Sequence, residues 1–182
     1  TLISKMVLPI LLLTSLAIGI TLSIYYVFWS GQQFNVTLNQ SIKHTENLAH
    51  FIESVDSAHI AQRLMARTYI DSQITSAELI QVNTSKVVAA TDRSHINRQY
   101  NFMRNSKSII PLITKSARPW YEVDHKKSIL SIYSLVIFSS RIYDKHNYIL
   151  SVKFDLTSFN IMTRQFIISI GAVLIGSLLI SL

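Results

Sequence analysis

The residues best suited to chemistry stand side by side, as Arg118, Pro119, Trp120 and Tyr121. A guanidinium group presents two parallel N–H donors that match the two oxygens of a carboxylate. An indole N–H adds a third donor, and an aromatic face can accept a cation. This cluster could therefore hold a small organic ligand that carries a carboxylate or a positive charge.

The same four residues also have a purely structural interpretation. Pro119 fixes φ and can set a turn. The two aromatic side chains are large enough to fill a hydrophobic core, and Arg118 could pair with Glu122 or Asp124. The sequence alone leaves both interpretations open.

Other kinds of chemistry lack their motifs. No glycine lies between Gly31 and Gly171, which excludes the glycine-rich loops of P-loop and Rossmann nucleotide sites. The six histidines are scattered without metal-ligand spacing, so we predict neither a metal site nor a cofactor. Ser41, His44 and Asp56 lack the nucleophile elbow of a hydrolase. We therefore expect this segment not to be an enzyme.

Two uncharged segments flank the region that carries this cluster. Residues 6–29 contain no charge and end in aromatic residues, which suit the interface of a bilayer. About 20 apolar helical residues cross a hydrocarbon core, so this segment is long enough to span it. Residues 166–182 are also uncharged and reach the end of the sequence. We predict transmembrane helices at 6–29 and 166–182, the second one truncated.

Residues 30–165 carry nearly all the charge and form the predicted water-soluble domain. All ten acidic residues and sixteen of the seventeen Lys and Arg residues lie in or beside it. No block of five or more like charges occurs, so we expect no nucleic-acid partner. The chain has no cysteine, which excludes disulfides and thiolate metal sites. A solvated basic surface is the simplest interpretation of the positive charge.

Helical periodicity continues beyond the first apolar segment. Apolar residues recur at steps of three or four, which predicts that the first span continues as one long helix. This stripe could hold a parallel homodimer together or could bury itself in its own domain. A second helix is predicted over 59–69. The stripe consists of Phe34, Leu38, Ile42, Thr45, Leu48, Ile52 and Val55.

Strand-like patterns follow the helices. We predict a hairpin of strands at 77–83 and 86–91, with a turn at Thr84 and Ser85. Two longer strands are predicted at 128–139 and 147–156, joined by a polar connection at 140–146, and a helix at 157–165 then leads into the second span. Hairpins with helices at both ends indicate an α+β fold, with a long N-terminal helix and an antiparallel sheet.

With these elements in place, the sequence resembles the Cache family, the extracytoplasmic PAS-like sensors of bacterial chemoreceptors, histidine kinases and cyclic-di-nucleotide enzymes. The resemblance rests on ARPWY at 117–121 and on the strand around Tyr133. SVKFDLTSF, which contains Asp155, and the hairpin AELIQVNTSKVVAAT complete it. It covers roughly residues 34–165 and implies a single PAS-like module.

The resemblance also implies a set of ligand-binding residues. Arg118 and Trp120 would hold a carboxylate, Tyr121 and Tyr133 would line the pocket, and Asp155 would hold an ammonium group. Apolar residues before Arg118 replace a tyrosine that the amino-acid-binding branch uses. The ligand is therefore left open between an amino acid, a small carboxylate and another organic molecule.

Taken together, these features predict the ligand-sensing part of a bacterial signalling receptor. We expect two passes through the inner membrane and a sensor domain in the periplasm or outside the cell. The protein is expected to continue past Leu182 into a cytoplasmic output domain of a histidine kinase, chemoreceptor or cyclic-di-GMP enzyme. The alternative is a membrane-anchored module that binds a periplasmic partner or has a structural role. Transport ranks last because neither span carries a charge.

Overall fold

A computed structural model describes residues 2–55, 58–68, 73–104, 107–108, 110–115, 118–138 and 146–181. The chain divides into two compact units. One contains Thr1–Thr37 and Thr157–Leu182, and the other contains Leu38–Leu156. Helix α1 (Leu2–Glu53) contributes residues to both units.

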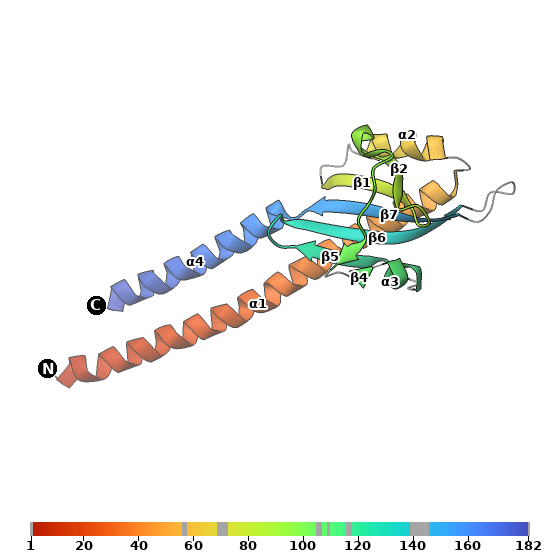
Figure 1. The fold of residues 1–182 in the computed structure, drawn as a ribbon. Coiled ribbons are helices and arrows are strands. Elements are labelled where there is room, and N and C mark those ends of the chain that lie inside the picture. The colour runs from red at the N-terminus through yellow and green to blue at the C-terminus, as the bar shows by residue number, and fades with distance from the viewer. Residues whose placement is uncertain are drawn as a thin grey trace. The chain divides into compact units, whose positions relative to one another are not determined.

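The first unit consists of the N-terminal part of α1 and of α4 (Thr157–Ser181), which run side by side (Figure 1). The Phe166 ring of α4 lies 4.9 Å from the Trp29 ring and 5.8 Å from the Tyr26 ring, between centroids. Segments Leu13–Glu53 and Thr157–Gly176 are long and apolar enough to cross a membrane, by length and composition. The helical part of the prediction for both apolar segments is therefore confirmed.

The second unit is built on a five-stranded antiparallel sheet in the order β2-β1-β7-β6-β5 (Figure 1). The predicted α+β class, with a long N-terminal helix and an antiparallel sheet, is confirmed. β7 lies in the middle of the sheet, and only Leu156 separates it from α4. The strands are β1 (Ile74–Gln81), β2 (Lys86–Ala90), β5 (Trp120–Asp124), β6 (Ile129–Phe138) and β7 (His146–Asp155).

Both predicted hairpins form. β1 pairs with β2, although the turn covers four residues, 82–85, rather than the two predicted. Ser85 takes a φ of 52°, so the turn is closed by a residue in the left-handed region without a glycine. β6 and β7 pair along ten residues. The expected connection at 140–146 falls mostly outside the described residues.

One face of the sheet packs against the C-terminal part of α1. Ile52 and Thr45 are fully buried there, and the predicted stripe packs largely inside the unit. The buried line also includes Ser41 and Ala49, which the apolar pattern missed, whereas Ile42 and Leu48 are only half-buried. Small residues let a helix axis approach a sheet closely, and the Thr45 hydroxyl is satisfied because it donates to the Ser41 carbonyl at 2.9 Å.

The edge strand β2 is covered by α2 (Ala58–Thr68), which corresponds to the helix predicted at 59–69. The Gln62 amide group donates to the Ala90 carbonyl at 2.8 Å and accepts from the Ala90 N–H at 2.7 Å. The Gln62 side chain thus satisfies the backbone groups of Ala90 that a neighbouring strand would otherwise bond. This protects the edge of the sheet from pairing with a strand of another chain.

The opposite face is covered by the long connection between β2 and β5, which crosses the sheet in Figure 1. It contains the 3₁₀ helix η1 (Arg93–His95), the short pair β3 (Met103–Arg104) and β4 (Lys107–Ser108), and α3 (Ile110–Lys115). Phe102 and Ile113 from this connection join Ile80 and Ile149 of the sheet in a buried cluster. We call the described residues of this connection from 91 to 115 (91–104, 107–108 and 110–115) the cover segment.

Candidate functional site

A single row of side chains crosses the middle of the covered face. Glu78 of β1 lies directly opposite Ser151 of β7, and Ser151 lies directly opposite Tyr133 of β6. Tyr133 in turn lies opposite Trp120 of β5. Residues directly opposite each other in antiparallel strands share one face of the sheet. We call Glu78, Ser151, Tyr133 and Trp120 the transverse row.

The aromatic half of the row is packed tightly. The Trp120 and Tyr133 rings lie 5.5 Å apart, tilted by 41°, in the range of favourable aromatic contacts. Tyr133 is buried because the alternation of β6 directs it toward the cover segment, while its neighbour Ile132 is directed to the α1 side. The row therefore offers an indole and a phenol surface beside polar groups.

Tyr100 of the cover segment is held over the row by backbone hydrogen bonds to β2 and to the turn that precedes it. Its N–H donates to the Ser85 carbonyl at 2.7 Å, and the Val87 N–H donates to the Arg98 carbonyl at 3.0 Å. Asn97 takes a φ of 66°, a left-handed conformation that asparagine tolerates better than most residues. These contacts fix the position from which Tyr100 reaches across the sheet.

Three hydroxyl groups meet beneath the cover segment. The Tyr100 oxygen lies 3.2 Å from Ser151 Oγ and 3.4 Å from the Tyr133 oxygen. Lys153 Nζ, from the next position of β7 on this face, lies 6.0 Å from the centroid of the Tyr100 ring. Each hydroxyl can donate and accept, so this cluster can exchange its internal hydrogen bonds for bonds to a polar ligand.

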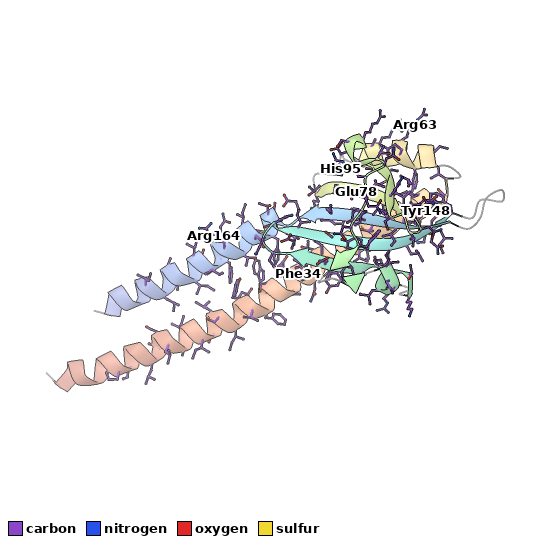
Figure 2. The ribbon with its side chains drawn as sticks, viewed as in Figure 1. Phe34, Arg63, Glu78, His95, Tyr148 and Arg164 are labelled. Atoms are coloured by element: carbon purple, nitrogen blue, oxygen red, sulfur yellow. The ribbon has the colours of Figure 1, made fainter. Side chains whose placement is uncertain are left out.

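The other end of the row carries an acid. Glu78 is 5% exposed, and its Oε1 lies 2.5 Å from His95 Nδ1 of η1 (Figure 2). Asp92 caps η1 and accepts from the Ser94 N–H at 2.8 Å, and this backbone hydrogen bond is the main reason why the pKa of Asp92 is lowered. The capped η1 thus places His95 beside Glu78, the buried acid of β1.

The structure brings together two of the five predicted site residues. Trp120 and Tyr133 are neighbours in the row, but Tyr121 is 43% exposed and occupies the opposite parity of β5. Asp155 is exposed and lies four positions along β7 from Ser151, about 13 Å away at strand spacing. Arg118 is exposed and lines a separate cleft with residues of α1. A binding role for any of the five stays a prediction.

Sequence reasoning missed Tyr100, Ser151, Glu78 and His95. A charged residue inside the predicted strand AELIQVN was the one available signal, because an acid within an otherwise apolar strand usually has a specific partner. The other three depend on strand register and on the path of the cover segment. Within the described residues, no group of three or more metal-binding side chains is close enough together to hold an ion.

Burial raises the pKa of both Tyr100 and Tyr133 above the usual value of about 10, and for Tyr133 desolvation outweighs the hydrogen bond to Tyr100. Above pH 10 the unfolded chain releases these protons while the folded chain keeps them. The free energy of unfolding is therefore expected to be unaffected below pH 10 and to fall above it, by up to about 1.4 kcal/mol per pH unit for each tyrosine.

Denaturant unfolding measured between pH 8 and about pH 11.5 checks this expectation. Tyr100→Phe removes one of the two groups, so its stability should fall less steeply with pH than that of the parent protein. Equal slopes for parent and variant would contradict the buried placement of the Tyr100 hydroxyl.

No model of a known protein family matches the chain, and no curated protein matches it.

Proposed function

We propose that the unit Leu38–Leu156 is a ligand sensor of the PAS-like Cache type, carried by a bacterial receptor that crosses the inner membrane twice. In this proposal the sensor lies outside the cytoplasm, and α1 and α4 pass its state to a cytoplasmic output domain. The ligand is a small organic molecule with polar groups, bound at the transverse row. The receptor would act as a homodimer.

The observation that carries this proposal is the position of the polar cluster on β7. Ser151 and Lys153 belong to the central strand, and β7 is followed after one residue by α4, which is apolar enough to span a membrane. The Leu156 N–H donates to the Ser128 carbonyl at 2.8 Å, and its side chain is buried. A shift of β7 would therefore be passed directly to the start of α4.

Ligand entry requires the cover segment to move. Ser151 is 1% exposed and Tyr133 is 6% exposed, so a ligand reaches their hydroxyl groups only when Tyr100 is displaced. The sensor then has two states, one with Tyr100 on the row and one with ligand there. A ligand shifts such a balance only by its difference in affinity for the two states.

The proposal predicts a thermal shift of the full chain in lipid nanodiscs. Melting is followed by Trp120 fluorescence after Trp29→Phe has removed the other tryptophan. The probes are amino acids, short mono- and dicarboxylates, and sugars. A ligand present at about a hundred times its dissociation constant stabilises the folded state by about 2.7 kcal/mol, which raises the melting temperature by about 5–10 °C.

Two tyrosine variants locate the binding site. Tyr133→Phe removes a hydroxyl from the row and should weaken binding about tenfold, whereas Tyr121→Phe makes the same change on the other parity of β5 and should leave binding unchanged. Loss of binding in Tyr121→Phe but not in Tyr133→Phe would show that the ligand binds somewhere other than the row. A chain that responds to none of the probes but captures a periplasmic protein would replace the sensor proposal with a partner-binding module.

A further inference from the structure

A cleft lies on the α1 side of the sheet, between α1, β6 and the residues just before β5. Its volume is about 250 Å³, slightly below the roughly 300 Å³ at which small-molecule sites usually begin. Its helix wall consists of Glu46, Ala49, His50 and Glu53, where Ala49 and His50 each lie three or four positions from both glutamates, so that all four share one face of α1. Its other wall consists of Ser134 and Leu135 of β6 and of Arg118 and Pro119, which lie just before β5.

Glu53 is already committed to neighbouring groups of the protein. Its Oε1 accepts from the Ile137 N–H at 3.2 Å, and its Oε2 lies 3.3 Å from His50 Nδ1. These contacts tie the end of α1 to β6. They occupy one acceptor site on each of its two oxygens and make Glu53 a fixed part of the cleft wall.

Glu46 is the acid that remains for a ligand. It is half-buried on the helix wall, and within the described residues its carboxylate makes neither a hydrogen bond nor an ion pair. A carboxylate without a protein partner has its acceptor sites open to the N–H donors of a cation. The Ser134 hydroxyl on the strand wall adds a second acceptor.

The charge of the cleft differs from that of the whole chain. The protein carries a net charge of +7, yet here two carboxylates face one guanidinium. The guanidinium belongs to Arg118, which is exposed, whereas both acids are half-buried on the helix side. With His50 counted as neutral, the two carboxylates and one guanidinium give the cleft lining a negative balance, opposite in sign to that of the chain.

We propose that this cleft is a second binding site, for a small organic ammonium ion held by Glu46. An ammonium group has N–H donors for both Glu46 and Ser134, and the apolar lining at Ala49 and Pro119 accepts a short alkyl chain. Because four of the lining residues belong to α1, the bound cation links α1 to the sheet. This site does not depend on the transverse row.

Calorimetric titration of the full chain in nanodiscs with ethylammonium tests the proposal, with propionate as an anion of similar size. Ethylammonium should bind in the millimolar range and propionate should not. Glu46→Gln should weaken ethylammonium binding about tenfold or more, because a neutral amide replaces a charged acceptor at nearly the same shape. Glu46→Asp, which keeps the charge, should restore much of the affinity.

Two further variants separate this site from other causes. Asp92→Asn removes one negative charge at an exposed position outside the cleft and should leave ethylammonium binding unchanged. Tyr133→Phe should also leave it unchanged, although the same variant is expected to impair the transverse row. Equal binding by the parent protein and Glu46→Gln, or no binding up to about 10 mM, would refute the second site without affecting the proposed sensor function.

Discussion

Truncation of Ile52 to alanine is expected to lower the free energy of unfolding by about 2–5 kcal/mol, whereas truncation of its neighbour Phe51 should change it by less than about 0.5 kcal/mol. Ile52 is fully buried between α1 and the sheet, and Phe51 is 60% exposed on the same turn. The larger side chain thus contributes less, because the apolar area that a side chain removes from water determines its contribution.

The two variants form a matched pair. Both replace a poor helix former with alanine, so their effects on helix propensity are similar and favourable. The measurement is denaturant unfolding of the full chain, followed by Trp120 fluorescence in the Trp29→Phe background. Equal losses for the two variants, or a larger loss for Phe51→Ala, would show that Ile52 does not seat α1 on the sheet.

This contact also bears on the homodimer that the helical stripe suggested. Leu38, Thr45 and Ile52 of the stripe are buried within the unit itself, so they are not available to a second copy. The exposed side of α1 in this unit is mainly polar, with Asn47 and His44 among its residues. A dimer seam made of the predicted stripe would require α1 to leave the sheet, and Ile52→Ala should favour that state.

The sequence predicts the elements of this fold because their patterns are local. A run of uncharged residues indicates each apolar helix, and alternation indicates β7, where Leu150, Val152 and Phe154 are all buried. The hairpin between β6 and β7 follows from two neighbouring strand patterns. The burial of the small residues Ser41 and Ala49 was not predicted, because a search for large apolar residues at helical spacing does not include them.

The candidate site depends on information that local patterns do not contain. Ser151 meets Glu78 only because β7 lies between β1 and β6, and neither that strand order nor the register is written in any single segment. Tyr121 and Trp120 are neighbours in β5 and therefore face opposite sides of the sheet. This difference can be recognised only once the boundaries of the strand are known. Tyr100 reaches the row through the path of the cover segment, which carries no periodic pattern.

Removal of the His95 imidazole is expected to cost about 2 kcal/mol of folding free energy. Removing the hydrogen-bond partner of a fully buried charged group costs about 3 kcal/mol or more. The estimate is smaller here because the His95 side chain is 32% exposed and water can partly replace it. Glu78, at 5% exposure, would keep a carboxylate that has lost its closest partner.

A double-mutant cycle isolates this pair from the rest of the cover segment. Glu78→Gln alone should cost less than His95→Ala, because the amide stays neutral when buried. Once Glu78→Gln has removed the charge, His95→Ala should cost at least about 1 kcal/mol less than it does in the parent protein. Asp92→Asn is the control, since Asp92 lies 3.9 Å from the other ring nitrogen and its side chain is 62% exposed, so its loss should change stability by less than about 0.5 kcal/mol.

The outcome of the cycle also distinguishes two ways in which the cover segment could be held. If Glu78 and His95 are strongly coupled, η1 is fixed at the β1 end of the row, and Tyr100 is free to move about that fixed point when a ligand enters. If their effects are additive, the pair contributes little, and the hydroxyl contacts of Tyr100 with Ser151 and Tyr133 are the main polar attachment. In the second case Tyr133→Phe should loosen the whole cover segment, and amide hydrogen exchange at 93–100 would rise in that variant. We expect the first result, because the contact between Glu78 and His95 is shorter than either hydroxyl contact of Tyr100 and involves a buried carboxylate.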